Sequence, residues 1–209
     1  MFVSTFELLL NASQLPREVQ GVPASALEVF EPISRDVLQG YFLTISNLEN
    51  REVILQFLFT VVSSPGEDVF SNSTVGSFFD STGVNTQLSF NSPTPKTHSI
   101  ILTFKPHDTG LLLVQPDPFL LPKPLDTSEI EIRGYVEVKN LQSCDKGFGI
   151  TRVLLTPEHR GTFYNLEVPK DSHGNIERDK PVTLSKEQQL DQIAYSLPTG
   201  PGKALFELG

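Results

Sequence analysis

Apolar and polar residues alternate in several short segments of this chain, with the two-residue period of a β-strand. The clearest is 129–139, EIEIRGYVEVK, where isoleucine and valine occupy one face and mostly charged residues the other. This pattern predicts a strand with one face on a core and one in water. The same period predicts further strands at 4–10, 26–30, 96–104, 111–114, 150–156 and 162–168.

The best-patterned stretch, 39–63, predicts a hairpin: two strands joined by a tight turn at 47–50. Two asparagines in that turn tolerate left-handed backbone angles and hydrogen-bond their own main chain. The second arm is apolar on nearly both faces. We therefore expect a central strand covered on both sides, and Ile54, Leu58 and Val62 are candidate interface residues.

Turn-forming residues predict two more hairpins and one strand-to-strand turn. Residues 106–110 would join the strands 96–104 and 111–114, and 198–202 would join 193–197 to 204–208. The turn is expected at 157–161, between 150–156 and 162–168. The Ser/Thr/Asn/Gly-rich region 69–96 is predicted to form loops around one or two short edge strands.

Some nine to twelve short strands and almost no helix predict an all-β fold, an antiparallel β-sandwich of Ig-like or jelly-roll-like type. The one short helix expected is at 186–190, after a capping-box pattern at Ser185 and Gln188. No composition break divides the chain, so we predict a single domain over 1–209, with a charged loop at 169–181.

Four prolines fall within 115–125, which excludes a central strand there. The segment is either a connection between sheets or an extended arm that docks on a neighbouring subunit. In the second case Phe119 and Leu120 would join the interface.

Composition narrows the function classes. The formal net charge is −9, with no basic cluster, so we expect neither a nucleic acid nor an anionic membrane as partner. Cys144 is the only cysteine, so no disulfide forms within the chain. The first ten residues lack the features of a signal peptide, and no apolar run approaches the roughly 20 residues of a membrane span. A cytoplasmic location is expected.

Motifs for catalysis are missing from the sequence. The four histidines are scattered without metal-ligand spacing, so no metal and no cofactor are predicted. Neither a nucleophile elbow nor a phosphate-binding glycine loop occurs. The sequence leaves the enzyme question open but favours a non-enzymatic protein.

The densest polar group is Thr156–Thr162, which carries an acid, an imidazole and a guanidinium. On a turn between strands, such residues are displayed for binding. Glu158, His159, Arg160 and Thr162 are therefore the candidate ligand-binding residues. The alternative is a surface turn closed by a contact between Glu158 and Arg160. For sugar binding, the available aromatic platforms would be Tyr135, Tyr164 and Tyr195.

The order of three features resembles the small bacterial β-sandwich proteins of the sensory-rhodopsin-transducer type. These features are FLTISN at 42–47 with its hairpin, PKTHSI at 95–100, and a long strand into a polar turn around His159. The resemblance covers about the middle half of the chain. It implies a homo-oligomeric β-sandwich that binds a protein or a small ligand. The added segments at both ends and the proline-rich insertion leave any signalling partner open.

Three functions are consistent with these observations. The first is a non-enzymatic β-sandwich that assembles with itself or binds a protein partner, most simply as a homo-oligomer. The second is a module for a small ligand or a carbohydrate. The third is a hydrolase whose site is assembled from loops.

Overall fold

The described part of the computed structural model comprises residues 1–13, 36–62, 68–117, 130–142, 149–164 and 191–209. Its strands pair antiparallel throughout, which confirms the all-β prediction. They form one hydrogen-bonded sheet, in the order β5-β4-β8-β2-β1-β9-β3-β7-β6, with β10, β11 and β12 attached beside β2. The elements are β1 (Phe2–Ser13), β2 (Asp36–Asn47), β3 (Val53–Val62), α2 (Val69–Ser73), β4 (Thr74–Phe79), β5 (Asn85–Leu88), β6 (Asn91–Thr94), β7 (Thr97–Phe104), β8 (Thr109–Pro116), β9 (Ile130–Asn140), β10 (Thr151–Tyr164), β11 (Asp191–Ser196) and β12 (Leu205–Leu208).

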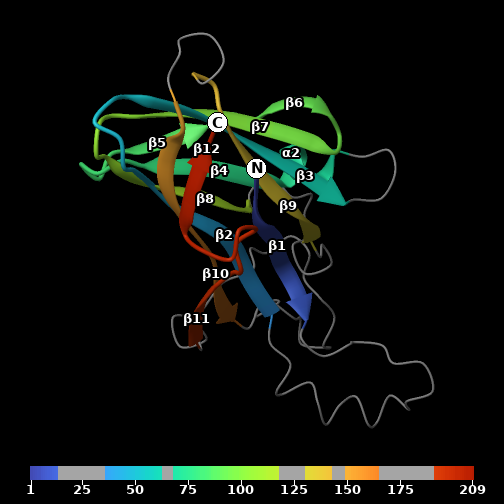
Figure 1. The fold of residues 1–209 in the computed structure, drawn as a ribbon. Helices are drawn as coiled ribbons and strands as arrows, with labels where there is room; N and C mark the ends of the chain where they lie inside the picture. The colour runs from blue at the N-terminus through green and yellow to red at the C-terminus, as the bar shows by residue number, and fades with distance from the viewer. Residues whose placement is uncertain (14–35, 63–67, 118–129, 143–148, 165–190) are drawn as a thin grey trace, which may run out of the picture.

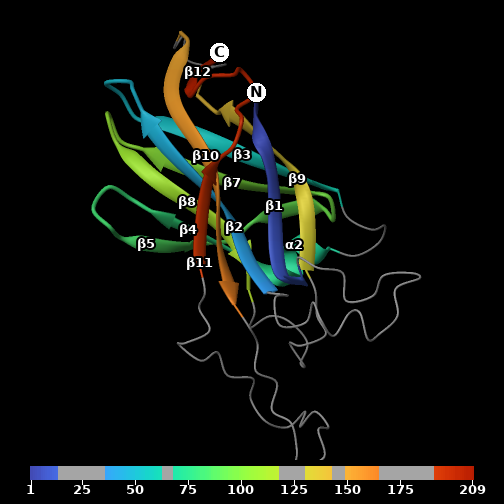
Figure 2. The ribbon, with the colours of Figure 1, turned by 90° about the horizontal axis from the view of Figure 1, so that it is seen from below.

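The sheet curls on itself so that its two halves enclose one apolar core, which makes the fold sandwich-like. One half contains β4, β8, β2 and β10, and the other contains β9, β3 and β7. Phe78 of β4 meets Phe104 of β7 edge-on, with ring centroids 5.5 Å apart, although no backbone pairing joins these strands. β1 belongs to both halves because it pairs with β9 and, at its far end, with β2. Figure 2 shows β11, β10, β2, β1 and β9 side by side.

β3 is a central strand, as predicted, because it lies between β7 and β9. Its inner residues, Val53 to Val61 at every second position, are almost fully buried. On the outer face Ile54 and Leu58 are half-buried, and Val62 is 73% exposed. Within the described residues of one chain nothing covers Val62, so coverage of this face by another subunit stays a prediction.

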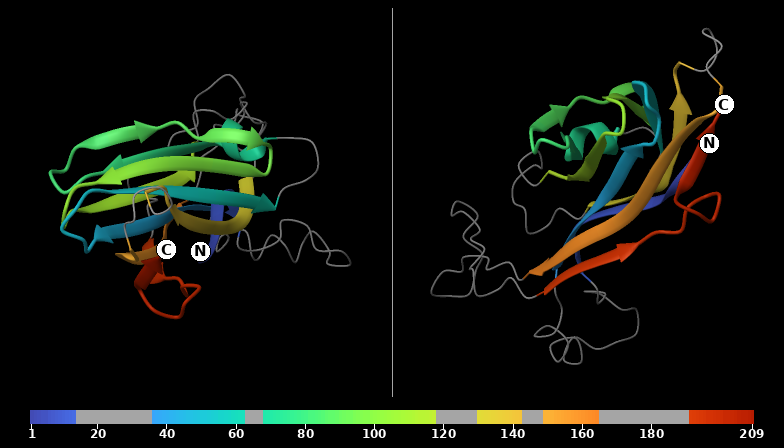
Figure 3. Two further views of the ribbon diagram at one scale, coloured as in Figure 1. Left: turned by 45° about the horizontal axis from the view of Figure 1, so that its top comes forward. Right: turned by 60° about the vertical axis from the view of Figure 1, so that its left-hand side comes forward.

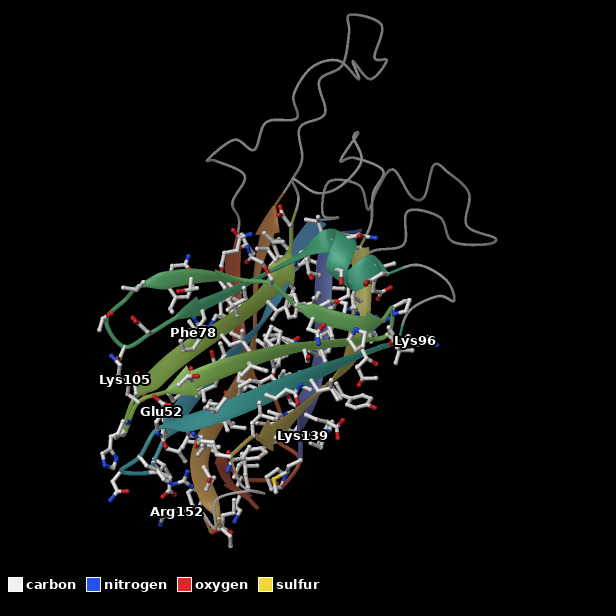
Figure 4. All side chains as sticks on the ribbon, turned by 90° about the horizontal axis from the view of Figure 1, so that it is seen from above. Glu52, Phe78, Lys96, Lys105, Lys139 and Arg152 are labelled. Carbon is white, nitrogen blue, oxygen red and sulfur yellow. The ribbon has the colours of Figure 1, made fainter. Side chains whose placement is uncertain are left out.

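The two predicted hairpins in the first half of the chain are wrong, because each turn carries the chain from one half of the sheet to the other. β2 pairs with β1, β8 and β10, whereas β3 pairs with β7 and β9. Likewise β7 and β8 do not pair. The two corners, 48–52 and 105–108, lie together: the Asn47 side chain donates to the Lys105 carbonyl at 2.8 Å. Glu52 and Lys105 mark this end of the molecule in Figure 4.

β10 runs straight through the predicted turn at 157–161. Proline is tolerated at position 157 because the neighbouring strand changes there. β12 begins at Leu205, opposite Leu154, and β11 ends at Ser196, opposite Glu158. The Pro157 carbonyl accepts a hydrogen bond from the Leu197 amide at 2.9 Å, and the missing N–H would point to this same edge. β11 and β12 both pair with β10, so the predicted C-terminal hairpin is also wrong (Figure 3).

Region 69–96 contains the predicted edge strands, β5 and β6, but also β4, which lies between β5 and β8. The only helix in the described part of the chain, α2, lies in this region, where none was predicted. The Asp68 carboxylate caps it by accepting the Ser71 amide at 3.0 Å. Phe70 of α2 is fully buried against Phe59 and Phe90.

Several predictions fall on residues outside the described ranges. These are the strand at 26–30, most of the proline-rich segment 115–125 with Phe119 and Leu120, the charged loop 169–181 and the helix 186–190. Within the described ranges, no helix is long and apolar enough to cross a bilayer. The two chain ends lie close together (Figure 1).

Candidate functional site

The predicted ligand-binding residues lie within five positions of β10, 158–162, so they divide between the two faces of the sheet. Glu158, Arg160 and Thr162 point outward. His159 points inward and is 5% exposed. The structure therefore brings three of the four residues together and places His159 behind them.

A hollow of about 320 Å³ lies on the outer face of β10 and its neighbours. Arg160 stands opposite Gly40 of β2 on one side and Ala194 of β11 on the other. A Cβ atom at Gly40 would lie 3.0 Å from the Gln115 Cβ, so glycine keeps this position open. Among the described residues, the lining is Leu38, Gly40, Phe42, Gln115, Arg160, Gly161, Thr162, Ile193 and Ala194.

The charge in the hollow is already balanced. Arg160 donates from Nε and Nη2 to one oxygen of Glu158, at 3.0 and 2.9 Å, which confirms the contact expected between these residues. The guanidinium also lies over the ring of Phe42, 4.7 Å from its centroid. The remaining guanidinium N–H groups, together with the Gln115 amide and the Thr162 hydroxyl, offer hydrogen bonds next to apolar side chains.

Behind the hollow, His159 belongs to a closed ring of hydrogen bonds. The Glu7 amide donates to His159 Nε2 at 3.0 Å, so the ring proton is assigned to Nδ1, which donates to Tyr195 Oη at 2.8 Å. Tyr195 Oη donates to Gln39 Oε1 at 3.4 Å. Gln39 Nε2 returns to the Glu7 carbonyl at 3.3 Å. We call these four residues the His159 circuit.

The His159 circuit satisfies a backbone edge that no strand covers. Pairing between β1 and β2 stops at Leu9 and Gln39, where the two halves of the sheet separate. Beyond this point the amide and carbonyl of Glu7 would be unpaired, and the side chains of His159 and Gln39 replace the missing strand. The circuit therefore fastens the two halves together.

Burial lowers the pKa of His159 below its usual value, and the nearby Glu7 carboxylate opposes this shift. That carboxylate also accepts Arg133 Nε of β9 at 2.7 Å. The pKa of Tyr195 is raised, first by burial and then by Glu7. His159 and Tyr195 are therefore both favoured in their neutral forms.

A second buried histidine, His98, has a serine and an aspartate beside it. Ser92 Oγ lies 2.8 Å from His98 Nδ1, and Asp68 Oδ1 lies 3.7 Å from Nε2. However, Nε2 contacts the Pro95 carbonyl at 3.2 Å, and the fully buried ring stacks on Phe70 at 4.5 Å. An imidazole without exposed surface cannot protonate a leaving group, so we interpret this group as a packing network.

No group of three or more His, Cys, Asp or Glu side chains that could hold a metal ion occurs in the part of the chain that the structure describes. Cys144, which the sequence singled out, lies outside it.

Sequence reasoning missed the residues that other strands contribute to the site. Gly40, Phe42 and Gln115 line the hollow, and Gln39 and Tyr195 complete the circuit. One signal was available: Gly40 interrupts an otherwise regular strand pattern, and a glycine within a strand indicates close approach of other groups.

No family model, curated protein or solved structure matches this chain. The likeness to the sensory-rhodopsin-transducer type stays a prediction.

Proposed function

We propose that this protein is a non-enzymatic binding protein that takes a small ligand in the hollow around Gly40 and Arg160. The observation that carries the proposal is the combination, in one depression, of apolar walls with the polar groups of Arg160, Gln115 and Thr162. Ligand sites commonly have this composition, because apolar contact supplies affinity and a few polar groups fix orientation.

The ligand we propose is neutral overall. An anion would gain from Arg160 but would lie close to Glu158, which already binds that guanidinium. A cation would find Glu158 occupied in the same way. A molecule with an apolar body and amide, carbonyl or hydroxyl groups satisfies both the apolar walls and the polar groups of the hollow.

Carbohydrate is the less favoured part of this proposal. Sugars stack on exposed aromatic faces, but Arg160 covers one face of Phe42. Tyr195 directs its hydroxyl toward His159, and Tyr135 packs against Phe2 with ring centroids 6.1 Å apart. Tyr164, the third predicted platform, has a side chain outside the described set.

Binding can be tested with the neutral fluorescent probe N-phenyl-1-naphthylamine and with ligand-observed NMR of a neutral fragment library. Ala194→Phe places a ring in the hollow from an exposed position and should weaken binding about tenfold or more. Ser196→Phe, on the same exposed strand but outside the hollow, is the matched control. Equal binding by both variants would place the probe elsewhere and contradict the proposal.

Self-assembly is a second candidate, favoured by the outer face of β7, β3 and β9. Ile101 is 57% exposed there and lies diagonally between half-buried Ile54 and Leu58. Glu137 and Lys139, on the same face of β9, have no ion partner among the described residues. A second copy related by a two-fold axis could pair each with the other.

Sedimentation velocity over a range of concentrations tests this second function. The wild type should dimerise, Glu137→Lys should weaken the dimer, and the exchanged pair Glu137→Lys with Lys139→Glu should restore it. A wild type that stays monomeric at high concentration would exclude this interface. The hydrolase stays a prediction without a supporting site in the described residues.

A further inference from the structure

The hollow and the His159 circuit are built from neighbouring residues of the same three strands. Gly40 follows Gln39 on β2, Arg160 follows His159 on β10, and Ala194 precedes Tyr195 on β11. Because successive residues of a strand point to opposite faces, the circuit lies on the inner face directly behind the hollow. A change in the circuit therefore acts on the backbone that forms the floor of the hollow.

We infer that the His159 circuit controls the hollow, holding it in its binding shape while the imidazole is neutral and releasing it when the imidazole is protonated. This inference rests on the proposed function, since it concerns the regulation of the same site. Neutral His159 accepts one hydrogen bond, from the Glu7 amide, and donates one, to Tyr195. The protonated ring has two donors and no acceptor, so it cannot face the Glu7 N–H.

Charged and titratable groups approach His159 from each element packed against it. β1 contributes Glu7, whose carboxylate is shared with Arg133 of β9. Tyr195 comes from β11. From β2, Tyr41 packs edge-on with ring centroids 6.5 Å apart.

Two of these neighbours change little when His159 gains a proton. Arg133 also pairs with Glu131, and the Tyr41 hydroxyl bonds Ser4 at 2.9 Å. On its own strand, the side chains of Glu158 and Arg160 point to the opposite face. Proton uptake therefore changes one hydrogen bond first, the one between β10 and β1.

Loss of that bond frees the edge of β1 and loosens Gln39 and Tyr195, which adjoin Gly40 and Ala194 of the hollow along β2 and β11. Burial holds the pKa of His159 below about 6.5, so the circuit is intact at neutral pH and opens as the medium becomes acidic. Ligand affinity should be full near neutral pH and fall in the acidic range. By linkage, a bound ligand should lower the pKa of His159 further.

The coupling is tested first without any ligand. Amide NMR signals of Gly40 and Gly161, in the floor of the hollow, are followed from pH 8 to 5 together with the ring signals of His159. The amide signals of both glycines should change with the same midpoint pH as the ring signals of His159. In His159→Gln, whose side chain keeps one acceptor and one donor but does not titrate, this shift should vanish.

Tyr195→Phe provides a second variant if His159→Gln folds poorly. It removes the acceptor of Nδ1–H but keeps the aromatic ring. Because the imidazolium gains more from that acceptor than the neutral ring does, the His159 midpoint should fall below that of the wild type, and the glycine shifts should move with it. The inference would be overturned if the glycine signals of the wild type did not titrate with the His159 midpoint. It would also be overturned if they titrated unchanged in His159→Gln.

The second arm measures affinity for N-phenyl-1-naphthylamine, a probe that stays neutral over this pH range. Between pH 7.5 and 5 the wild type should lose about tenfold in affinity, and His159→Gln should lose much less. If the probe does not bind in the hollow but the glycine amide signals titrate with His159, the coupling stands and the proposed function fails. If the probe binds the hollow with no pH dependence tied to His159, binding stands and the inference is overturned.

Discussion

The two buried histidines make opposite use of the same side chain. His98 donates from Nε2 to the Pro95 carbonyl and accepts from Ser92 at Nδ1, whereas His159 accepts at Nε2 and donates from Nδ1. Burial lowers the pKa of both, and a nearby carboxylate opposes the shift in each case: Asp68 for His98 and Glu7 for His159. The two histidines therefore differ in where they and their partners lie in the fold.

The partners of His98 are local in sequence, and those of His159 are distant. Asp68, Ser92 and Pro95 lie within the chain segment that leads into β7. Glu7 is 152 residues from His159. A local network fixes one corner, whereas a network that joins distant strands couples the two halves of the sheet. Of the two, the His159 network lies behind a surface hollow.

The largest expected effect is that of His98→Ala. It removes a fully buried ring from its stack on Phe70, takes away the imidazole partner of the Pro95 carbonyl and leaves Ser92 with Ser71 as its partner. The free energy of unfolding should fall by about 3–4 kcal/mol. Urea denaturation measures this, with Thr103→Ala, an exposed position on the same strand, as the control. A loss below about 1 kcal/mol would mean that the network contributes little.

His159→Ala should cost somewhat less, about 2–3 kcal/mol, because water can reach Tyr195. His159→Gln should recover at least half of that loss, because its amide can both accept and donate. If both variants were equally destabilised, the shape of the imidazole rather than its hydrogen bonds would hold the halves together. Urea denaturation of His159→Ala and His159→Gln distinguishes these two outcomes.

Acid should destabilise the protein by less than either truncation, because each protonated ring keeps its packing. Both histidines are favoured neutral in the fold, so their contribution is complete above about pH 6.5. It is lost progressively as pH falls from 6.5 toward the lower pKa of the folded state. Urea midpoints measured from pH 8 to 5 test this. His159→Gln should flatten the profile in part, with His98 responsible for the remainder.

The smallest effect expected is that of Arg160→Ala, below about 1 kcal/mol, because its pair with Glu158 is partly exposed. The pH profile of stability should keep its wild-type shape, since Arg160 lies on the opposite face from His159. A changed profile would show that charge on the outer face reaches the circuit. Binding of the neutral probe should weaken in the same variant.

The strands were predictable wherever one face is buried and the other is wet, as in β9. Their partners were not. A polar turn such as 47–50 shows that a strand ends but not whether the chain returns to the same half of the sheet. In the fold, the apolar faces of β2 and β3 pack against each other across the core. A hairpin would bury these faces no better, so the hydrophobic pattern does not distinguish the two arrangements.

The predicted turn in β10 failed for a different reason. Pro157, Glu158 and Gly161 carry turn propensity, but β2 pairs with this strand from Val153 to Tyr164 and overrides it. Arg160 and Thr162 were correctly grouped because they are close in sequence. Gln115 and Tyr195 reach the site only through strand pairing, and a single sequence contains no signal for that.

The pairing of β1 with β9 also sets the order in which the chain can fold. Phe6 lies opposite Gly134, so the first strand has no partner on that edge until the chain has extended well past residue 130. Such distant pairing makes folding slow, on a scale of about milliseconds to seconds. During synthesis this edge of β1 stays unpaired, and an exposed strand edge with apolar residues favours aggregation at that stage.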